Sequence, residues 1–265
     1  MKKFRRQIIY DLRAGTIQYW KQYSVIFLFF LLLHFIFITS YQGENSLSYF
    51  DYIWNFVKGI PPFAGADRNQ SFSIPMEWAV LHIICMFMNL KYPYIDLYER
   101  NIQFFIYSAS RRNWWLSKCI WVVMNTVIYY SFFWLGAAVV NFIRQGGVSS
   151  QILIEINPWK QVLMIFVLPI FVSIAVGMVA VVFTVFLNPI IGMIVGLGIY
   201  IASVYWENSI LIGNYSMIIR NYWVKGEGEI HTVKGILFSI IIILFTIAAG
   251  SLMIQKKEID RKGKE

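Results

Sequence analysis

Hydrophobic residues in this chain gather into six long runs, separated by shorter stretches that hold most of the charged residues. Each run is close to the roughly 20 residues with which a helix crosses the apolar core of a bilayer. The runs cover residues 22–41, 74–94, 119–143, 162–187, 190–206 and 235–254. The pattern predicts an all-α polytopic membrane protein with six transmembrane helices over residues 22–254. An N-terminal amphipathic segment (1–21) and a charged tail (255–265) flank this domain.

The fourth and fifth runs are separated only by the dipeptide Asn188-Pro189. Proline removes a backbone hydrogen bond from a helix interior and kinks or ends the helix there. Two structures therefore fit this part of the sequence. Either a tight turn divides two separate spans, as six spans require, or one long helix is kinked at Pro189.

Two connections are longer than a turn requires. In residues 46–62, apolar positions recur at helical spacing before Pro61-Pro62. This pattern predicts an amphipathic helix in the membrane interface, with a loop that dips onto the helices as the alternative. In residues 207–234, the first half is too apolar for a solvated loop and too short to span a bilayer. It predicts a re-entrant or interfacial hairpin before the last helix.

The distribution of cations sets the expected orientation. The chain is 58% hydrophobic and 14% charged, with a net charge of +9. Such a charge can indicate nucleic-acid binding, but here the cations flank apolar runs, so no nucleic-acid partner is predicted. With the N-terminus inside, Lys and Arg are more numerous in the inner connections than in the outer ones. The positive-inside rule therefore places both termini in the cytoplasm.

The sequence shows no pattern of a catalytic or metal site. It contains no HExxH pair, no GxSxG elbow and no GxxxxGK[ST] phosphate loop. Cys85 and Cys119 lie in or beside apolar runs, without the spacing of a metal site or a disulfide framework. We therefore expect no enzymatic activity, catalytic residue, metal or cofactor on this chain, and no ATP binding of the phosphate-loop kind.

Small and polar residues inside the runs predict contacts between helices. Gly192 and Gly196 form a GxxxG pair in the fifth run, which favours close helix packing, either within the chain or in a dimer. His82, Asn89 and Asn125 lie within the second and third runs. These residues could line a water-filled pathway through the membrane, or they could form ordinary hydrogen bonds between helices. We prefer the second interpretation.

The connection between the second and third runs has an unusual composition. Residues 107–118, YSASRRNWWLSK, combine three cations with two tryptophans. Trp and Arg are favoured anchors of protein interfaces, so this segment could dock onto another protein. Anchoring at the membrane surface by cations and aromatic rings is the alternative, and we prefer docking. The candidate docking residues are Glu99, Ser110, Arg111, Arg112, Trp114, Trp115 and Lys118.

This segment resembles the ABC-2 type transporter permease family, the membrane subunits of bacterial ABC exporters of drugs, bacteriocins and amphipathic peptides. The likeness rests on Glu99, on Ser110-Arg111 some ten residues later, on Trp114-Trp115 and on Lys118 before the third run. The six-span plan, the inside termini and the apolar hairpin before the last span are also similar. The N-terminal segment departs from the family, because it is only roughly amphipathic and Gly15 interrupts it.

The resemblance implies a function and a set of partners. The segment between helices 2 and 3 would be a cytoplasmic coupling helix docked on a separate ABC ATPase subunit, present in two copies that bind ATP and Mg. A second copy or a paralogue of the permease would complete a dimer in the bacterial plasma membrane. The exported substrate would be hydrophobic or amphipathic, such as a peptide. The alternative is a non-transporting membrane immunity or sensor protein that binds a partner.

Overall fold

The computed structural model describes residues 2–17, 19–40, 49–62, 73–98, 110–145 and 157–256, and these residues form helices and no strand. The longer helices are α1 (Lys2–Ile17), α2 (Trp20–Ser40), α3 (Tyr49–Val57), α4 (Met76–Tyr98), α6 (Arg111–Gln145), α8 (Leu168–Phe186), α9 (Pro189–Tyr205) and α11 (Thr232–Lys256). The shorter ones are α7 (Pro158–Val162), the π-helical turn η1 (Leu163–Val167), the 3₁₀ turns η2 (Ile212–Ser216) and η3 (Ile218–Arg220), and α10 (Tyr222–Lys225).

Helices occur at each of the six apolar runs. Within the described part of the chain, four are long and apolar enough to cross a membrane: α2, α6, the continuous stretch Pro158–Phe186 that ends with α8, and α11. The helix α4 covers the second predicted span, and α9, with 17 residues, covers the fifth. The described part of the fold is therefore all-helical, with four candidate membrane-spanning helices.

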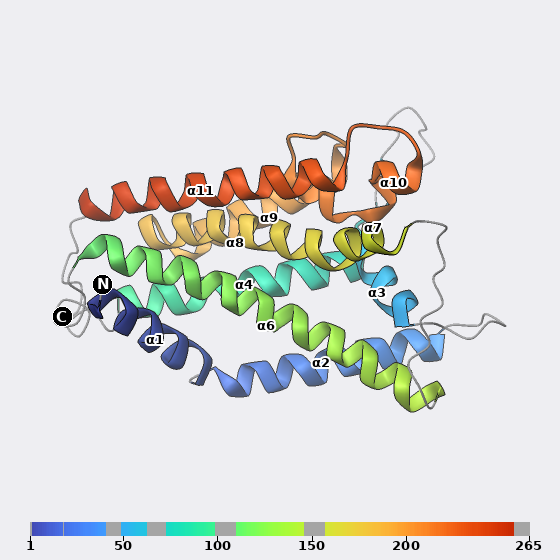
Figure 1. Cartoon of the computed structure of the whole chain (residues 1–265), viewed down its shortest axis with the longest axis horizontal. Coiled ribbons are helices and arrows are strands. Elements are labelled where there is room, and N and C mark those ends of the chain that lie inside the picture. Colours follow the sequence, from blue (N-terminus) through green and yellow to red (C-terminus); the bar gives the residue numbers. More distant parts are fainter. Residues whose placement is uncertain are drawn as a thin grey trace.

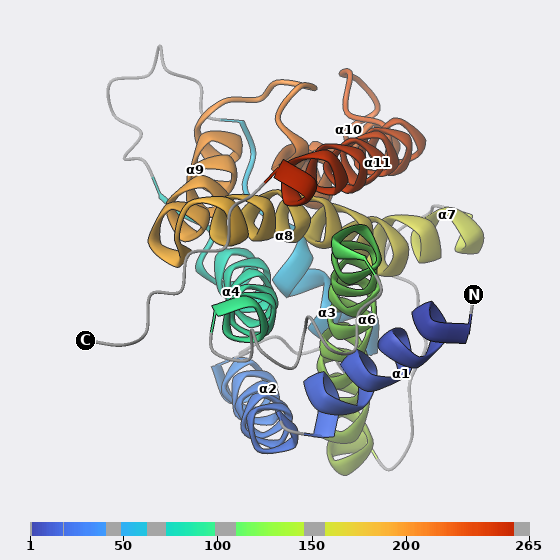
Figure 2. The same cartoon turned by 90° about the vertical axis from the view of Figure 1, so that its left-hand side faces the viewer.

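The long helices lie side by side along the long axis of the molecule (Figure 1). One end of this bundle is formed by α1, the last turn of α4, the first turn of α6 and the last turn of α11, and is called the α1 end below. The opposite end carries α3, α7 and α10 and is called the α3 end. Figure 2 shows α8 in the middle of the bundle, between α4, α6, α9 and α11, while α1 and α2 lie outside, against α6.

Asn188-Pro189 forms a tight turn between two separate helices. The side chain of Asn188 caps α9 by accepting a hydrogen bond from the Ile191 amide over 2.8 Å, and Pro189 takes the first helical position, where it loses no hydrogen bond. A Cβ atom on Gly192 would overlap Thr184, and one on Gly196 would overlap Met86 of α4. Both glycines therefore pack against neighbouring helices of the same chain.

The two long connections both pack onto the bundle. The predicted helix within residues 46–62 is present as α3, and its Tyr52, Ile53 and Phe56 are buried against α4, α6 and η1. Residues 207–231 form η2, η3 and α10, and η2 is buried against α8, α9 and α11. These contacts fix where both segments lie relative to the helices, at the α3 end.

Candidate functional site: a buried ionic cluster

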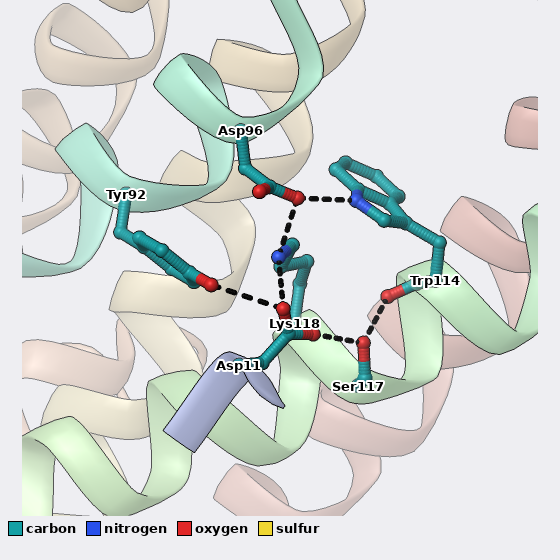
Figure 3. A network of polar contacts seen from close by, with 6 residues as sticks. All are labelled: Asp11, Tyr92, Asp96, Trp114, Ser117 and Lys118. Atoms are coloured by element: carbon teal, nitrogen blue, oxygen red, sulfur yellow. Dashed lines mark hydrogen bonds and ion pairs between the residues drawn. The ribbon is translucent and has the colours of Figure 1, made fainter. Parts of the chain in front are cut away.

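Three charged side chains meet inside the α1 end of the bundle. Lys118 of α6 places its Nζ atom 2.7 Å from Asp11 Oδ1 of α1 and 2.6 Å from Asp96 Oδ2 of α4 (Figure 3). The Lys118 side chain is fully buried, and those of Asp11 and Asp96 are only 1% and 8% exposed. The cluster therefore joins three helices through charges that have almost no contact with solvent.

Neutral donors add hydrogen bonds to both carboxylates. Tyr92 Oη donates to Asp11 Oδ1 over 2.9 Å, and Ser117 Oγ donates to Asp11 Oδ2. The indole Nε1 of Trp114 donates to Asp96 Oδ2 over 2.8 Å. One ammonium and two carboxylates leave one excess negative charge, and these three donors partly offset it. We call Asp11, Tyr92, Asp96, Trp114, Ser117 and Lys118 the ionic cluster.

Helical periodicity brings these residues together. Residues three or four apart share a face of a helix, so Trp114, Ser117 and Lys118 point to the same side of α6. Tyr92 and Asp96 do the same on α4. Lys118 also lies over the Tyr92 ring, 4.3 Å from its centre, which adds a cation–π contact.

Gly15 lets α1 approach α6 closely enough for Asp11 to reach the cluster. It lies one helical turn after Asp11 on the same face, and a Cβ atom there would overlap the indole ring of Trp121 on α6. The helix α1 runs unbroken from Lys2 to Ile17. The expectation that Gly15 interrupts this segment was therefore wrong, because the glycine serves close packing between two helices.

We expect Gly15→Ala to loosen α1 and to lower the free energy of unfolding by about 1–3 kcal/mol, the usual cost of overpacking. Gly198→Ala is the matched control, because a Cβ atom on Gly198 of α9 meets nothing within 4 Å. Alanine is the better helix former, so this control should be neutral or stabilising. Thermal unfolding in detergent, together with hydrogen exchange of the α1 amides, compares the stability of the two variants. Equal stability would contradict the close contact between Gly15 and Trp121.

The structure describes six of the seven candidate docking residues and places these six in two groups. Ser110 and Arg112 are exposed, and Ser110 Oγ caps α6 by accepting the Asn113 amide hydrogen. Arg111 is half-buried and donates to the Gln255 carbonyl of α11 over 3.2 Å. Glu99 lies outside the described residues.

The second group points into the bundle. Trp114 and Lys118 belong to the ionic cluster, and Trp115 is 1% exposed. Its indole Nε1 donates to the Ile247 carbonyl of α11 over 3.1 Å, and its ring packs so closely on Gly250 that a Cβ atom there would overlap it. In this conformation these three side chains join helices of the same chain rather than present a surface to a partner.

Asp11, Asp96, Tyr92 and Ser117 were absent from the sequence-based candidates. Asp11 carried a usable signal, because it is the one acidic residue among six cations in residues 1–22. An acid there opposes the positive-inside pattern, so it needs another role. Lys118 was among the candidates, but no sequence signal paired it with Asp96.

The polar residues in the middle of the bundle bond to one another. Asn125 Nδ2 donates to Asn89 Oδ1 over 2.7 Å, and Asn89 Nδ2 donates to Thr126 Oγ1 over 3.1 Å. Tyr23 Oη donates to Asn125 Oδ1, which ties in α2. His82 contacts the Trp78 carbonyl of its own helix over 2.9 Å. These contacts fit the second interpretation of the polar residues, hydrogen bonding between helices.

Among the residues that the structure describes, no group of three His, Cys, Asp or Glu side chains could hold a metal ion. Comparisons with protein-family models, with curated proteins and with solved structures found no match to this chain. The ionic cluster is therefore the best-supported candidate site. Its buried, hydrogen-bonded groups fix three helices relative to one another.

Proposed function

We propose that this chain is the permease subunit of an ATP-driven exporter of the ABC-2 type, with six spans and both termini in the cytoplasm of a bacterium. ATP hydrolysis takes place on a separate ATPase subunit, bound in two copies near residues 99–112. A second copy or a paralogue of the permease completes the complex. The substrate is hydrophobic or amphipathic, such as a peptide, in keeping with the few charges inside the bundle.

The ionic cluster is the observation that supports this proposal. The connection between α4 and α6 leaves from Tyr98 and returns at Arg111. Asp96 and Lys118, which the cluster joins, flank this connection, and Asp11 adds α1 to the same body. A force applied to the connection would therefore move the ends of α4, α6 and α1 together. Arg111 and Trp115 extend the linkage to α11.

The exposed position of Arg112 gives the sharpest test of docking. We expect Arg112→Glu to weaken the productive contact with the ATPase, because reversing the charge of an interface residue breaks its electrostatic complementarity with the partner. ATP-dependent transport into inverted vesicles should fall about tenfold or more, the factor that corresponds to 1.4 kcal/mol. Insertion and thermal stability should not change, since Arg112 is exposed at the surface.

Lys234→Glu is the matched control, because Lys234 is an exposed cation of α11 at the α3 end. It should transport as the unchanged chain does. The first step of the experiment is purification of the tagged full chain from its own membranes, with identification of any chain that carries a phosphate loop. Purification without an ATPase, or full transport by Arg112→Glu, would favour the alternative of a non-transporting membrane protein that binds another partner.

A further inference from the structure

The helix α1 has an inner and an outer face with different chemistry. Its inner face carries Asp11 and Gly15 and packs on α6. Its outer face forms a shallow groove that is lined by Arg6, Ile9, Tyr10, Arg13, Ala14 and Ile17. Large apolar side chains remain open to the surroundings there, with Ile9 41%, Tyr10 48% and Ile17 67% exposed. The ionic cluster leaves this outer face uncovered.

Two cations lie among these apolar side chains. Arg6 and Arg13 are exposed and seven residues apart, so they lie on the same side of the helix, about 10 Å apart along its axis. Within the described part of the chain, neither guanidinium has an ion-pair partner. The groove thus combines unpaired positive charge with an apolar floor, which matches a ligand that has an anionic head and a hydrocarbon tail.

The position of α1 indicates the source of such a ligand. The helix directly precedes α2, the first candidate membrane span, whose first residue Trp20 is 59% exposed. Figure 2 shows α1 at the periphery of the bundle, running across the outside of α6. A helix placed beside the start of a span lies at the depth of the lipid headgroups, where Arg and Trp are favoured.

We propose that the outer face of α1 is a binding site for an anionic phospholipid. The phosphate lies between the guanidinium groups of Arg6 and Arg13, and an acyl chain runs along Ile9, Tyr10 and Ile17. Bound lipid would hold α1 from outside while Asp11 and Lys118 hold it from inside. This site does not depend on the transport proposal, since it requires only that α1 meets a bilayer.

The test measures lipid binding to the purified full chain in detergent. Native mass spectrometry follows binding of phosphatidylglycerol and of phosphatidylcholine to the unchanged chain, to Arg6→Gln/Arg13→Gln and to Arg112→Gln/Lys256→Gln. The last variant removes the same charge from exposed residues at the same end of the molecule, outside the groove. A fourth variant, Ile9→Ser/Ile17→Ser, keeps the charge and removes part of the apolar floor.

The proposal requires preference for phosphatidylglycerol in the unchanged chain. Affinity should fall about 30-fold in Arg6→Gln/Arg13→Gln, which corresponds to about 1 kcal/mol per cation near an anionic surface. It should also fall in the serine variant and stay unchanged in Arg112→Gln/Lys256→Gln. Equal losses in the two glutamine variants would overturn the site in favour of diffuse surface charge. Competition by millimolar inorganic phosphate would overturn it in favour of a free-anion site.

Discussion

Lys118→Met should destabilise the protein more than any substitution on its surface. The change removes the single cation that lies 2.6–2.7 Å from Asp11 and Asp96 and leaves two carboxylates buried beside each other. Breaking a buried ion pair by removing one partner costs about 3–5 kcal/mol, because the remaining charge has neither water nor a counterion. Thermal or denaturant unfolding in detergent should show this loss, and α1 should become more accessible to protease.

Two further variants separate the effect of charge from that of packing. Asp96→Asn should cost far less, because it leaves one ammonium and one carboxylate, a balanced pair. Adding Asp11→Asn and Asp96→Asn to Lys118→Met removes every charge and should recover most of the lost stability. If the triple variant is no more stable than Lys118→Met alone, the loss of stability comes from altered packing around the Lys118 side chain. The electrostatic explanation would then be wrong.

The positions of the helices could be predicted from the sequence because apolar runs and capping residues act locally. Asn188-Pro189 is an example. The sequence was compatible with either a turn or a kinked helix there, and the structure has the turn. Asn188 and Pro189 are both residues that favour the start of a helix. The helix in residues 46–62 was also predictable from its spacing and is present as α3. The spacing of its apolar residues could not predict how deeply this helix is buried against α4, α6 and η1.

The ionic cluster could not be predicted, since it depends on how three helices pack, and α1 lies far from α4 and α6 in the sequence. Asp11 and Lys118 are 107 residues apart, and only the packing of α1 on α6 brings them together. Gly15 illustrates the same limit, because the sequence alone shows a poor helix former there, whereas the tertiary structure shows a close approach to Trp121.

The aromatic segment before the third run was ambiguous for a geometric reason. Neighbouring positions of a helix face different directions, so cations and tryptophans that are adjacent in the sequence need not share a surface. Arg112 is exposed, while Trp114, Trp115 and Lys118 are buried toward α4, α1 and α11. Under the proposed function, the ATPase would contact Arg111 and Arg112. The buried Trp114, Trp115 and Lys118 would transmit its movement to the neighbouring helices.

A second buried cation holds the opposite end of the molecule together. Arg220 of η3 is fully buried and donates to five acceptors. They are the carbonyls of Ile60, Pro61, Ser203 and Val204, and the side-chain oxygen of Asn214. Two of these carbonyls belong to the last turn of α9, where a helix leaves carbonyls unpaired and favours a cation. Burial lowers the pKa of Arg220 to about 10 against the opposing effect of Glu207, so the group stays charged at neutral pH.

Arg220→Leu should therefore cost at least about 3 kcal/mol, because several buried acceptors lose their donor at once and each unmet group costs about 1–3 kcal/mol. Arg220→Lys should recover only part of this stability, since an ammonium cannot reproduce the planar fork of five donors. Lys225→Leu is the control within the same segment. Lys225 is one third exposed and lies 3.7 Å from Glu207, and such a surface pair contributes at most about 1 kcal/mol.

Hydrogen exchange distinguishes a local from a global effect of these Arg220 substitutions. Because Arg220 connects residues 60–61, the end of α9 and η2, its loss should release amides in residues 207–231 before those of α8. The apparent melting temperature should fall with Arg220→Leu and stay near that of the unchanged chain with Lys225→Leu. If Arg220→Leu and Lys225→Leu exchange and melt alike, water replaces the guanidinium without cost and Arg220 does not hold this end together.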